Sequence, residues 1–325
     1  MTSVVYIHEN PMQTVLPHLE EYLPFANNPH YMIVVPPVKV EDSPTEDSPA
    51  KDSPAKDSPA EDSPAKDSLV IASFEPFKCP PKDKPWAVAT TDFTRPGEAE
   101  FWFWSSIEAS EVDIRDKGLL EESCNLLKSM VTLIVENHKD KKLLSLGCLH
   151  AAFIPFIPES SIETKTKTYM KYTFTRGHLN EPTLGEDFQG CHLGDVKDNE
   201  LIKLVAASSE VYRSPETLQK YNSTAAYLDA EESKDTALGW CWTARDGTLT
   251  TLFVKEEYRN RQIAKLVMWH HLQREFVTRK FVCVDVDTDN KGSVKACTGL
   301  GAAQAYPAIW LTIDMPDFIS TKVER

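Results

Sequence analysis

The stretch VKEEYRNRQIAKL, residues 254–266, decides the fold. It follows the strand-forming run TLTTLFV (248–254) and leads into a segment that is expected to be helical to about Phe276. The turn between them carries Arg259 and Arg261 and lacks the glycine that such turns usually contain. The first backbone N–H groups of a helix have no intrahelical acceptor, so a helix start attracts anions. The stretch therefore fits either a seat for a polyphosphate or an ordinary solvated helix start.

The elements around this turn form a dense α/β pattern. Before it, ALGWCWT (237–243) and TLTTLFV are joined through Asp246-Gly247, which predicts a β-hairpin. After it come a predicted strand FVCVDVD (281–287), a short helix from about 292 to 299 and a strand AIWLTID (308–314). Helices are also predicted at 196–207 and 215–222.

This order of elements resembles the Gcn5-related N-acetyltransferase (GNAT) fold. Motif A of that superfamily, V-x-P-x-x-R-x-x-G-x-[GA], is met at Val254, Arg259 and Ala264. Glu256 stands where proline is common, and Gln262 stands where glycine is common. The resemblance implies coenzyme A as the anion at the helix start, with arginines suited to its pyrophosphate.

A second motif lies at the distance that the superfamily requires. The pattern N-x-x-[AS]-x-x-x-Y-x-x-x-G-F is met at Asn290, Ser293 and Gly301, with Cys297 in the tyrosine place and Ala302 in the phenylalanine place. Two motifs on the correct elements are much harder to obtain by accident than one. We therefore expect an α/β fold: a GNAT-type mixed sheet flanked by helices, with a degenerate GNAT-like N-terminal half.

Within the superfamily the chain is most similar to the glycine N-acyltransferase family. The shared residues are Cys241-Trp242, Glu257-Tyr258-Arg259, and Val286-Asp287 followed by Asn290, so the resemblance is specific over about 237–302. It implies transfer of an acyl group from acyl-CoA, the co-substrate, to the amine of glycine or another small amino acid, with no bound cofactor. Two alternatives stay open: a GNAT enzyme with a different amine acceptor, and a non-catalytic acyl-CoA-binding or scaffold protein.

The resemblance places acyl-CoA on the end of the strand and the start of the helix. Backbone N–H groups near 252–254 would polarise the acyl carbonyl, and those of 260–264 would face the phosphates. The expected cofactor-binding residues are Leu252, Phe253, Val254, Arg259, Asn260, Arg261, Gln262, Ile263, Ala264, Asn290 and Ser293.

The catalytic candidates are Asp246, Thr248 and Cys297. The family's general base is a glutamate at the position that Thr248 occupies, and a threonine hydroxyl is no base near neutral pH. Asp246 on the turn, or Asp285 or Asp287 on the neighbouring strand, could take the proton instead, or a water could relay it. Cys297 stands where many members have the tyrosine that protonates the leaving thiolate; a buried cysteine can equally be a small apolar filler.

Composition narrows the class of protein. The formal net charge of −14 leaves no basic surplus for nucleic acid as a general partner. Seven cysteines without a C-x-x-C pair favour reduced thiols in an intracellular protein and give no metal site. The start MTSVVYIHENP lacks a signal core, and no apolar run approaches the ~18 residues that span a bilayer. We expect a cytoplasmic protein without membrane contact; the family resemblance makes mitochondria the alternative.

The N-terminal part contains a low-complexity insert. The Asp-Ser-Pro repeat at 41–68 cannot bury enough apolar surface to order itself, so we expect a disordered insert. Its Ser-Pro-Ala-Lys copies suit a proline-directed kinase or a binding partner, and a passive spacer is the alternative. Around it, strands are predicted at 4–8, 31–37, 86–93 and 100–107, and an amphipathic helix at 119–139. The expected organisation is an α/β domain (1–155), a connecting segment (156–187) and the GNAT-like domain (188–325).

Overall fold

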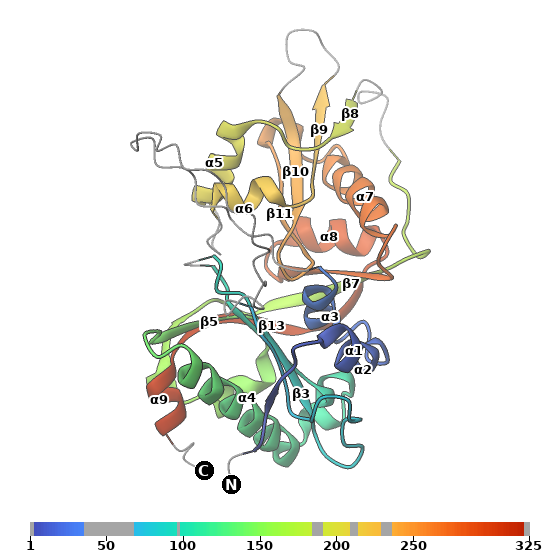
Figure 1. Cartoon of the computed structure of the whole chain (residues 1–325). Coiled ribbons are helices and arrows are strands. Elements are labelled where there is room, and N and C mark those ends of the chain that lie inside the picture. Colours follow the sequence, from blue (N-terminus) through green and yellow to red (C-terminus); the bar gives the residue numbers. More distant parts are fainter. Residues whose placement is uncertain are drawn as a thin grey trace, which may run out of the picture.

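The computed structural model describes residues 3–35, 68–95, 98–183, 191–208, 214–228 and 236–321. Residues 41–67 of the Asp-Ser-Pro repeat lie outside these ranges. The prediction that the repeat is disordered therefore concerns residues that the structure does not describe. The described residues form a 13-stranded mixed sheet with helices on both faces, which confirms the predicted fold class (Figure 1).

The N-terminal half is built on five strands. Strands β1 (Tyr6–Ile7), β2 (Val70–Ala72), β3 (Ala87–Thr91) and β4 (Phe101–Ser105) are antiparallel neighbours, and β5 (Leu143–His150) runs parallel to β4. Helix α4 (Lys117–Asn137) connects β4 to β5 and packs its apolar side on Phe101 and Phe103. The opposite face, with Trp104, is covered by α1 (Pro11–Thr14), α2 (Leu16–Glu20) and α3 (Asn27–Val34).

The C-terminal half repeats this plan. Strands β8 (Cys191–Gly194), β9 (Ser223–Leu228), β10 (Ala237–Thr243) and β11 (Thr248–Val254) are antiparallel, and β12 (Phe281–Asp287) runs parallel to β11. Helix α7 (Ile263–Glu275) connects β11 to β12 and, with α8 (Lys291–Gly299), covers one face. Helices α5 (Asn199–Ser208) and α6 (Pro215–Lys220) cover the other face. In each half an antiparallel hairpin is thus followed by a helix and a parallel strand.

Three strands join the halves into one sheet. Strand β7 (Tyr169–Thr175) pairs with β12, and β13 (Ala303–Asp314) pairs with β7 through its first part and with β5 through its last part. Strand β6 (Ile162–Lys165) also pairs with β13, and α9 (Met315–Ser320) ends the described chain. The domain boundaries 1–155, 156–187 and 188–325 stay a prediction; the sheet itself is continuous across them.

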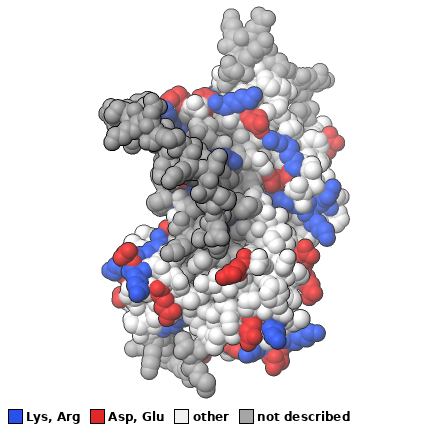
Figure 2. Space-filling view, viewed as in Figure 1, with Lys and Arg blue, Asp and Glu red and all other residues white. Residues whose placement is uncertain are grey.

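Short 3-10 helices complete the chain's path: η1 (Ser106–Ala109), η2 (Asp113–Arg115), η3 (Ala151–Phe156), η4 (Glu159–Ser161) and η6 (Glu256–Tyr258). On the face that Figure 2 shows, Lys and Arg side chains are interspersed with Asp and Glu over both halves. Among the described helices, none combines the length and the apolarity that a bilayer span would require.

One predicted element is wrong. The run at 31–37 was expected to be a strand, but Tyr31 to Val34 form the end of helix α3. Met32 and Ile33 are buried against the sheet, while Pro29 lies in the first turn, where its missing N–H costs nothing. Burial of this helix side outweighs the weak preference of β-branched residues for strands.

Candidate active site

The site opens where strands β11 and β12 part. Their parallel pairing is confined to Thr248 with Cys283 and Leu249 with Val284, although both strands continue. A bulge accompanies the parting: Thr251 has a positive φ of 52°, and the β10–β11 register shifts between Trp240 and Trp242. The pairing ends at Leu249, three residues before the backbone groups at 252–254 that were expected to face the acyl carbonyl.

A cavity of about 760 Å³ lies between the diverging strands. This volume is in the range of ligand sites rather than of packing defects. Strand β11 contributes one wall, β12 the other, and the start of α8 the end; Leu204 of α5 and Trp310 of β13 complete the apolar lining. The charged side chains of the lining are those of Lys167, Asp285 and Asp287.

The start of helix α7 has no side-chain cap. Gln262 precedes the helix with φ of 67° and provides no side-chain cap, and Asn260 also has a positive φ of 63°. The equivalent helix of the other half differs: Asp116 accepts hydrogen bonds from the N–H groups of Gly118 (2.8 Å) and Leu119 (3.0 Å). The carboxylate of Asp116 thus caps the start of α4, whereas the first N–H groups of α7 have no side-chain cap.

The predicted cofactor residues fall into three groups. Leu252, Phe253, Asn290 and Ser293 line the cavity. Arg259, Asn260, Arg261 and Gln262 are exposed on the loop outside it, where the Arg259 Nε donates to the carbonyl of Val254 (3.1 Å). Val254 and Ala264 are half-buried and Ile263 is buried in the core under α7, so Ile263 offers only its backbone to a ligand.

Helix α8 carries the second motif. The Asn290 side chain caps the helix by accepting from the N–H of Ser293 (3.1 Å). Cys297 also lines the cavity, and burial raises the pKa of its thiol to about 12. A thiol with that pKa is protonated at neutral pH, but it is a weak acid for protonating a thiolate.

Thr248 and Asp246 are held by the N-terminal half. The Nδ2 of Asn28 on α3 donates to the Asp246 Oδ2 (2.7 Å) and to the Thr248 Oγ1 (3.1 Å), and the Asp246 Oδ1 accepts from the N–H of Thr248 (3.1 Å). Thr248 lines the cavity, whereas Asp246 is outside the lining and only 1% exposed. Of these two candidates, only Thr248 can meet a ligand directly.

A buried polar cluster lies beside Thr248. It consists of Asn28, Asp246, Cys148, Asp285 and Lys171. The Asp285 Oδ1 is 2.7 Å from the Lys171 Nζ, and its Oδ2 accepts from the Cys148 thiol (2.7 Å); the same sulfur is 3.4 Å from the Asp246 Oδ2. Burial alone would lower the pKa of Lys171, but Asp285 together with Cys148, Tyr306 and Cys283 outweighs this effect and holds that pKa well above its ordinary value.

Sequence reasoning missed three members of this cluster. Asn28, Cys148 and Lys171 come from α3, β5 and β7, three elements far apart in the chain. The one local signal was Lys171 itself, a charged residue between strand-forming residues, because its cross-strand partner on β12 is Asp285. The remaining contacts depend on how the halves pack.

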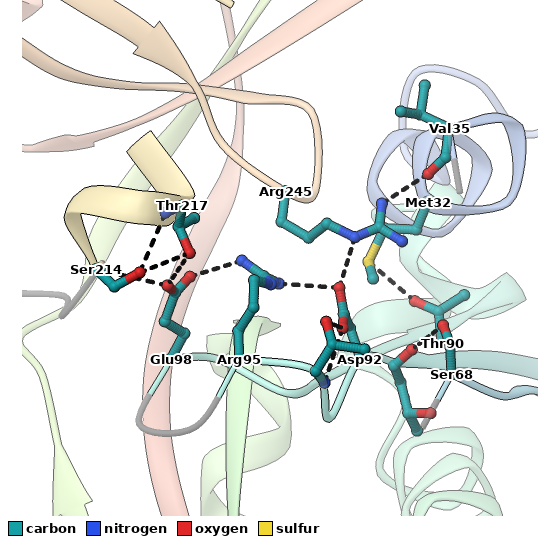
Figure 3. A network of polar contacts seen from close by, with 12 residues as sticks. Met32, Val35, Ser68, Thr90, Asp92, Arg95, Glu98, Ser214, Thr217 and Arg245 are labelled. Carbon is teal, nitrogen blue, oxygen red and sulfur yellow. Dashed lines mark hydrogen bonds and ion pairs between the residues drawn. The ribbon is translucent and has the colours of Figure 1, made fainter. Parts of the chain in front are cut away.

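A second polar network fixes the hairpin turn to the N-terminal half. Figure 3 shows Arg245 reaching from the β10–β11 turn to Asp92; the Nε–Oδ2 distance is 2.7 Å. Arg95 lies between Asp92 (3.2 Å) and Glu98 (2.6 Å), and Glu98 accepts from the Thr217 hydroxyl of α6 (2.6 Å). Because these groups are buried on both sides, the turn that presents Thr248 cannot move independently of the N-terminal half.

A bulged hairpin, a splayed parallel pair and an uncapped helix start between them define the GNAT class of acyltransferases. The comparisons agree with this class. Residues 2–172, more than half of the chain, match the family described as acyl-CoA N-acyltransferase verG N-terminal domain. The chain belongs to that family. No curated protein matches the chain.

One of the solved structures that resemble the chain shares its fold, at low sequence identity. A Drosophila protein from a structural genomics consortium superposes with a TM-score of 0.51 at 10% identity, covering 76% of this chain and 79% of its own. A tandem GNAT protein of the clavulanic acid biosynthesis pathway gives 0.39 at 12% identity, with 76% and 82% covered. A GCN5-related N-acetyltransferase from Kribbella flavida gives 0.40 at 14% identity, with 61% and 76% covered.

Within the described residues, no group of His, Cys, Asp and Glu side chains is arranged to hold a metal ion. The seven cysteines are all free.

Proposed function

We propose that this protein is an acyl-CoA-dependent N-acyltransferase whose acceptor is the amine of glycine or another small amino acid. The cavity between the parted strands β11 and β12 carries the proposal, because the unpaired edge of β11 and the polar start of α8 border one space, and the start of α7 follows β11 just outside it. The resemblance of residues 237–302 to the glycine N-acyltransferase family supports the acceptor.

The proposed position of CoA follows from the unpaired edge of β11 and from the helix start that follows it. Beyond Leu249 the edge of β11 that faces β12 has no strand partner, so its backbone groups are available to an extended pantetheine arm. Leu252 and Phe253 would contact this arm, and the pyrophosphate would bind at the start of α7, where Arg259 and Arg261 supply positive charge. Asn290 and Ser293 form the wall beside the arm.

The acceptor side follows from the charges of the lining. A small amino acid is a zwitterion, and the lining offers both signs: the ammonium of Lys167 and the carboxylates of Asp285 and Asp287. Lys167 and Asp287 form an ion pair at the cavity, so their charges are already ordered there. A lining with one ammonium and two carboxylates suits a zwitterion better than a second anion.

The proposal is tested by thiol release from acetyl-, benzoyl- and longer acyl-CoA, with and without glycine and a panel of amino acids. Release that depends on an amino acid supports it, and mass spectrometry of the acylated amine identifies the product. Release only with polyamines or protein amines would keep the enzyme class and replace the acceptor.

Thr248 in the place of the family's glutamate favours a second candidate, a non-catalytic acyl-CoA-binding protein. Calorimetric titration separates the two: CoA binding without release in the presence of any acceptor would support the binding protein.

A further inference from the structure

We propose that Asp285 is the catalytic base of this enzyme, and that Thr248 orients the acceptor through its hydroxyl proton. The proposal rests on the N-acyltransferase function above and assigns the step for which the sequence left several candidates. It is carried by the hydrogen bonds of the buried polar cluster and by which of its members line the cavity.

The orientation of the Thr248 hydroxyl follows from Asn28. The Asn28 amide nitrogen must face the Asp246 carboxylate, because only a donor can approach an ionised oxygen at 2.7 Å. The second hydrogen of the same nitrogen is directed to the Thr248 Oγ1 at 3.1 Å. Since Oγ1 accepts there, its own proton is left for another acceptor, and the side chain borders the cavity. Thr248 is thus arranged as a donor and not as a base.

Asp246 is not placed to take the proton. Its two oxygens accept from the Thr248 N–H, Asn28 and the more distant Cys148 thiol. It does not line the cavity, so an acceptor amine cannot reach it without breaking the turn. Asp246 stabilises the hairpin and the contact between the halves.

Asp285 has the position that Asp246 lacks. It lines the cavity on β12, one residue past the last parallel pair with β11. Lys171 and the Cys148 thiol each contact one of its oxygens at 2.7 Å, which fixes the carboxylate but leaves lone pairs free for another donor. Lys171 is 1% exposed, so the pair is ordered and water-shielded on its far side.

The reaction balances with this assignment. The acceptor ammonium gives a proton to Asp285, and the amine attacks the thioester carbonyl carbon, forming the C–N bond. The C–S bond breaks with its electron pair on sulfur, and the nitrogen loses its second proton. One of the two protons goes to the thiolate, which leaves as free CoA thiol, and the other goes to solvent.

The test must separate a base from a structural ion pair. Asp285→Asn alone would leave Lys171 buried without a counter-charge, which destabilises the fold. The variant Asp285→Asn/Lys171→Met removes both charges together. We expect its kcat to fall about 100-fold or more, the usual contribution of a general base. CoA affinity by calorimetry should stay within about 3-fold, since neither group is at the predicted CoA contacts.

The decisive variant adds Thr248→Glu to that pair. This restores a carboxylate on the opposite wall of the same cavity, at the family's position, and we expect it to recover at least about 10-fold of the lost kcat. A merely structural role of Asp285 would not be rescued in this way. Asp289→Asn, the same change at an exposed carboxylate outside the cavity lining, is the matched control: kcat and the KM for the acceptor should both stay within about 3-fold.

The outcomes are distinct. Retained kcat in Asp285→Asn/Lys171→Met overturns the assignment and leaves the proposed function standing. A loss without rescue by Thr248→Glu also overturns it, because the loss is then structural. Wild-type protein that releases no thiol with any acceptor overturns the proposed function and the base together.

Discussion

Gly247 allows a quantitative test of how the N-terminal half covers the site. It lies in the β10–β11 turn with φ of 76°, and a Cβ added there would be 2.4 Å from the Cγ of Tyr31 and 2.7 Å from the Nη2 of Arg279. Tyr31 belongs to α3, and the Arg279 guanidinium covers its ring at 4.3 Å. The Gly247→Ala variant should therefore be destabilised by backbone strain and by a clash with the other half.

Backbone strain and the clash with the Tyr31 ring contribute different free energies, and only the clash is removed by a second substitution. A left-handed conformation costs a residue with a Cβ about 1–2 kcal/mol, and overpacking against an aromatic ring costs roughly 1–3 kcal/mol. The sum predicts a loss of about 2–5 kcal/mol in the free energy of unfolding for Gly247→Ala. Tyr31→Ala removes the ring, and the flexible end of the Arg279 side chain can move away, so in that background Gly247→Ala should cost only the backbone part.

The assay is urea denaturation of the wild type, both single variants and the double variant, followed by fluorescence and far-UV circular dichroism. We expect a coupling free energy of roughly 1–3 kcal/mol between the two positions, with the double variant more stable than the two single losses combined. Additive losses would show that α3 does not press on the turn, and the reasoning about the contact between the halves would be refuted.

Three further predictions concern the anion seat and the core. Arg259→Ala should weaken CoA binding about 5-fold or more through loss of a charged phosphate contact, whereas Arg115→Ala, an exposed arginine beside α4, should not; equal affinities would place the pyrophosphate elsewhere. Gln262→Gly should raise CoA affinity several-fold with little change in melting temperature, because relief of the positive φ and the entropy of glycine offset each other; weaker binding would contradict the motif A alignment. Burial raises the pKa of Glu108 to about 8 from an ordinary 4.5, so the folded protein binds the proton more tightly and stability should fall as pH rises from about 4.5 to about 8. Glu108→Gln should abolish that loss, which is at most about 4 kcal/mol between pH 5 and 8, and parallel stability–pH curves for the two proteins would disprove it.

The elements of the C-terminal half could be predicted from the sequence because their signals are local. The Asp-Gly turn and alternating residues predicted β10 and β11 with the bounds that the structure has, and FVCVDVD coincides with β12. Helix α4 was visible as an amphipathic repeat. In contrast, the run at 31–37 carries strand-forming residues, and only the burial of Met32 and Ile33 against the N-terminal sheet makes residues 31–34 helical.

The residues of the candidate site also divide into those that the sequence indicated and those that it did not. Motif spacing indicated Thr248, Asn290, Ser293 and Cys297, and these residues do meet at one cavity. It could not indicate Lys171 or Asn28, because their partners are set by strand register and by the packing of α3 on a distant turn. Asp246 shows the limit of reasoning from proximity in sequence. It is two residues from Thr248, yet its carboxylate accepts hydrogen bonds within the turn and from Asn28 and does not line the cavity.

Strand β13 has a consequence for how the chain folds during synthesis. Residues 303–308 of β13 pair with β7, and residues 308–314 pair with β5. The sheet of each half is therefore completed only when β13 has been synthesised. A ribosome that has released the first 175 residues has exposed β5 and β7 with open edges, which are sites of misassociation until they are paired. Most multidomain chains finish their first domain while the second is still being made. Here the N-terminal half cannot close before β13 emerges, and the two halves become native together.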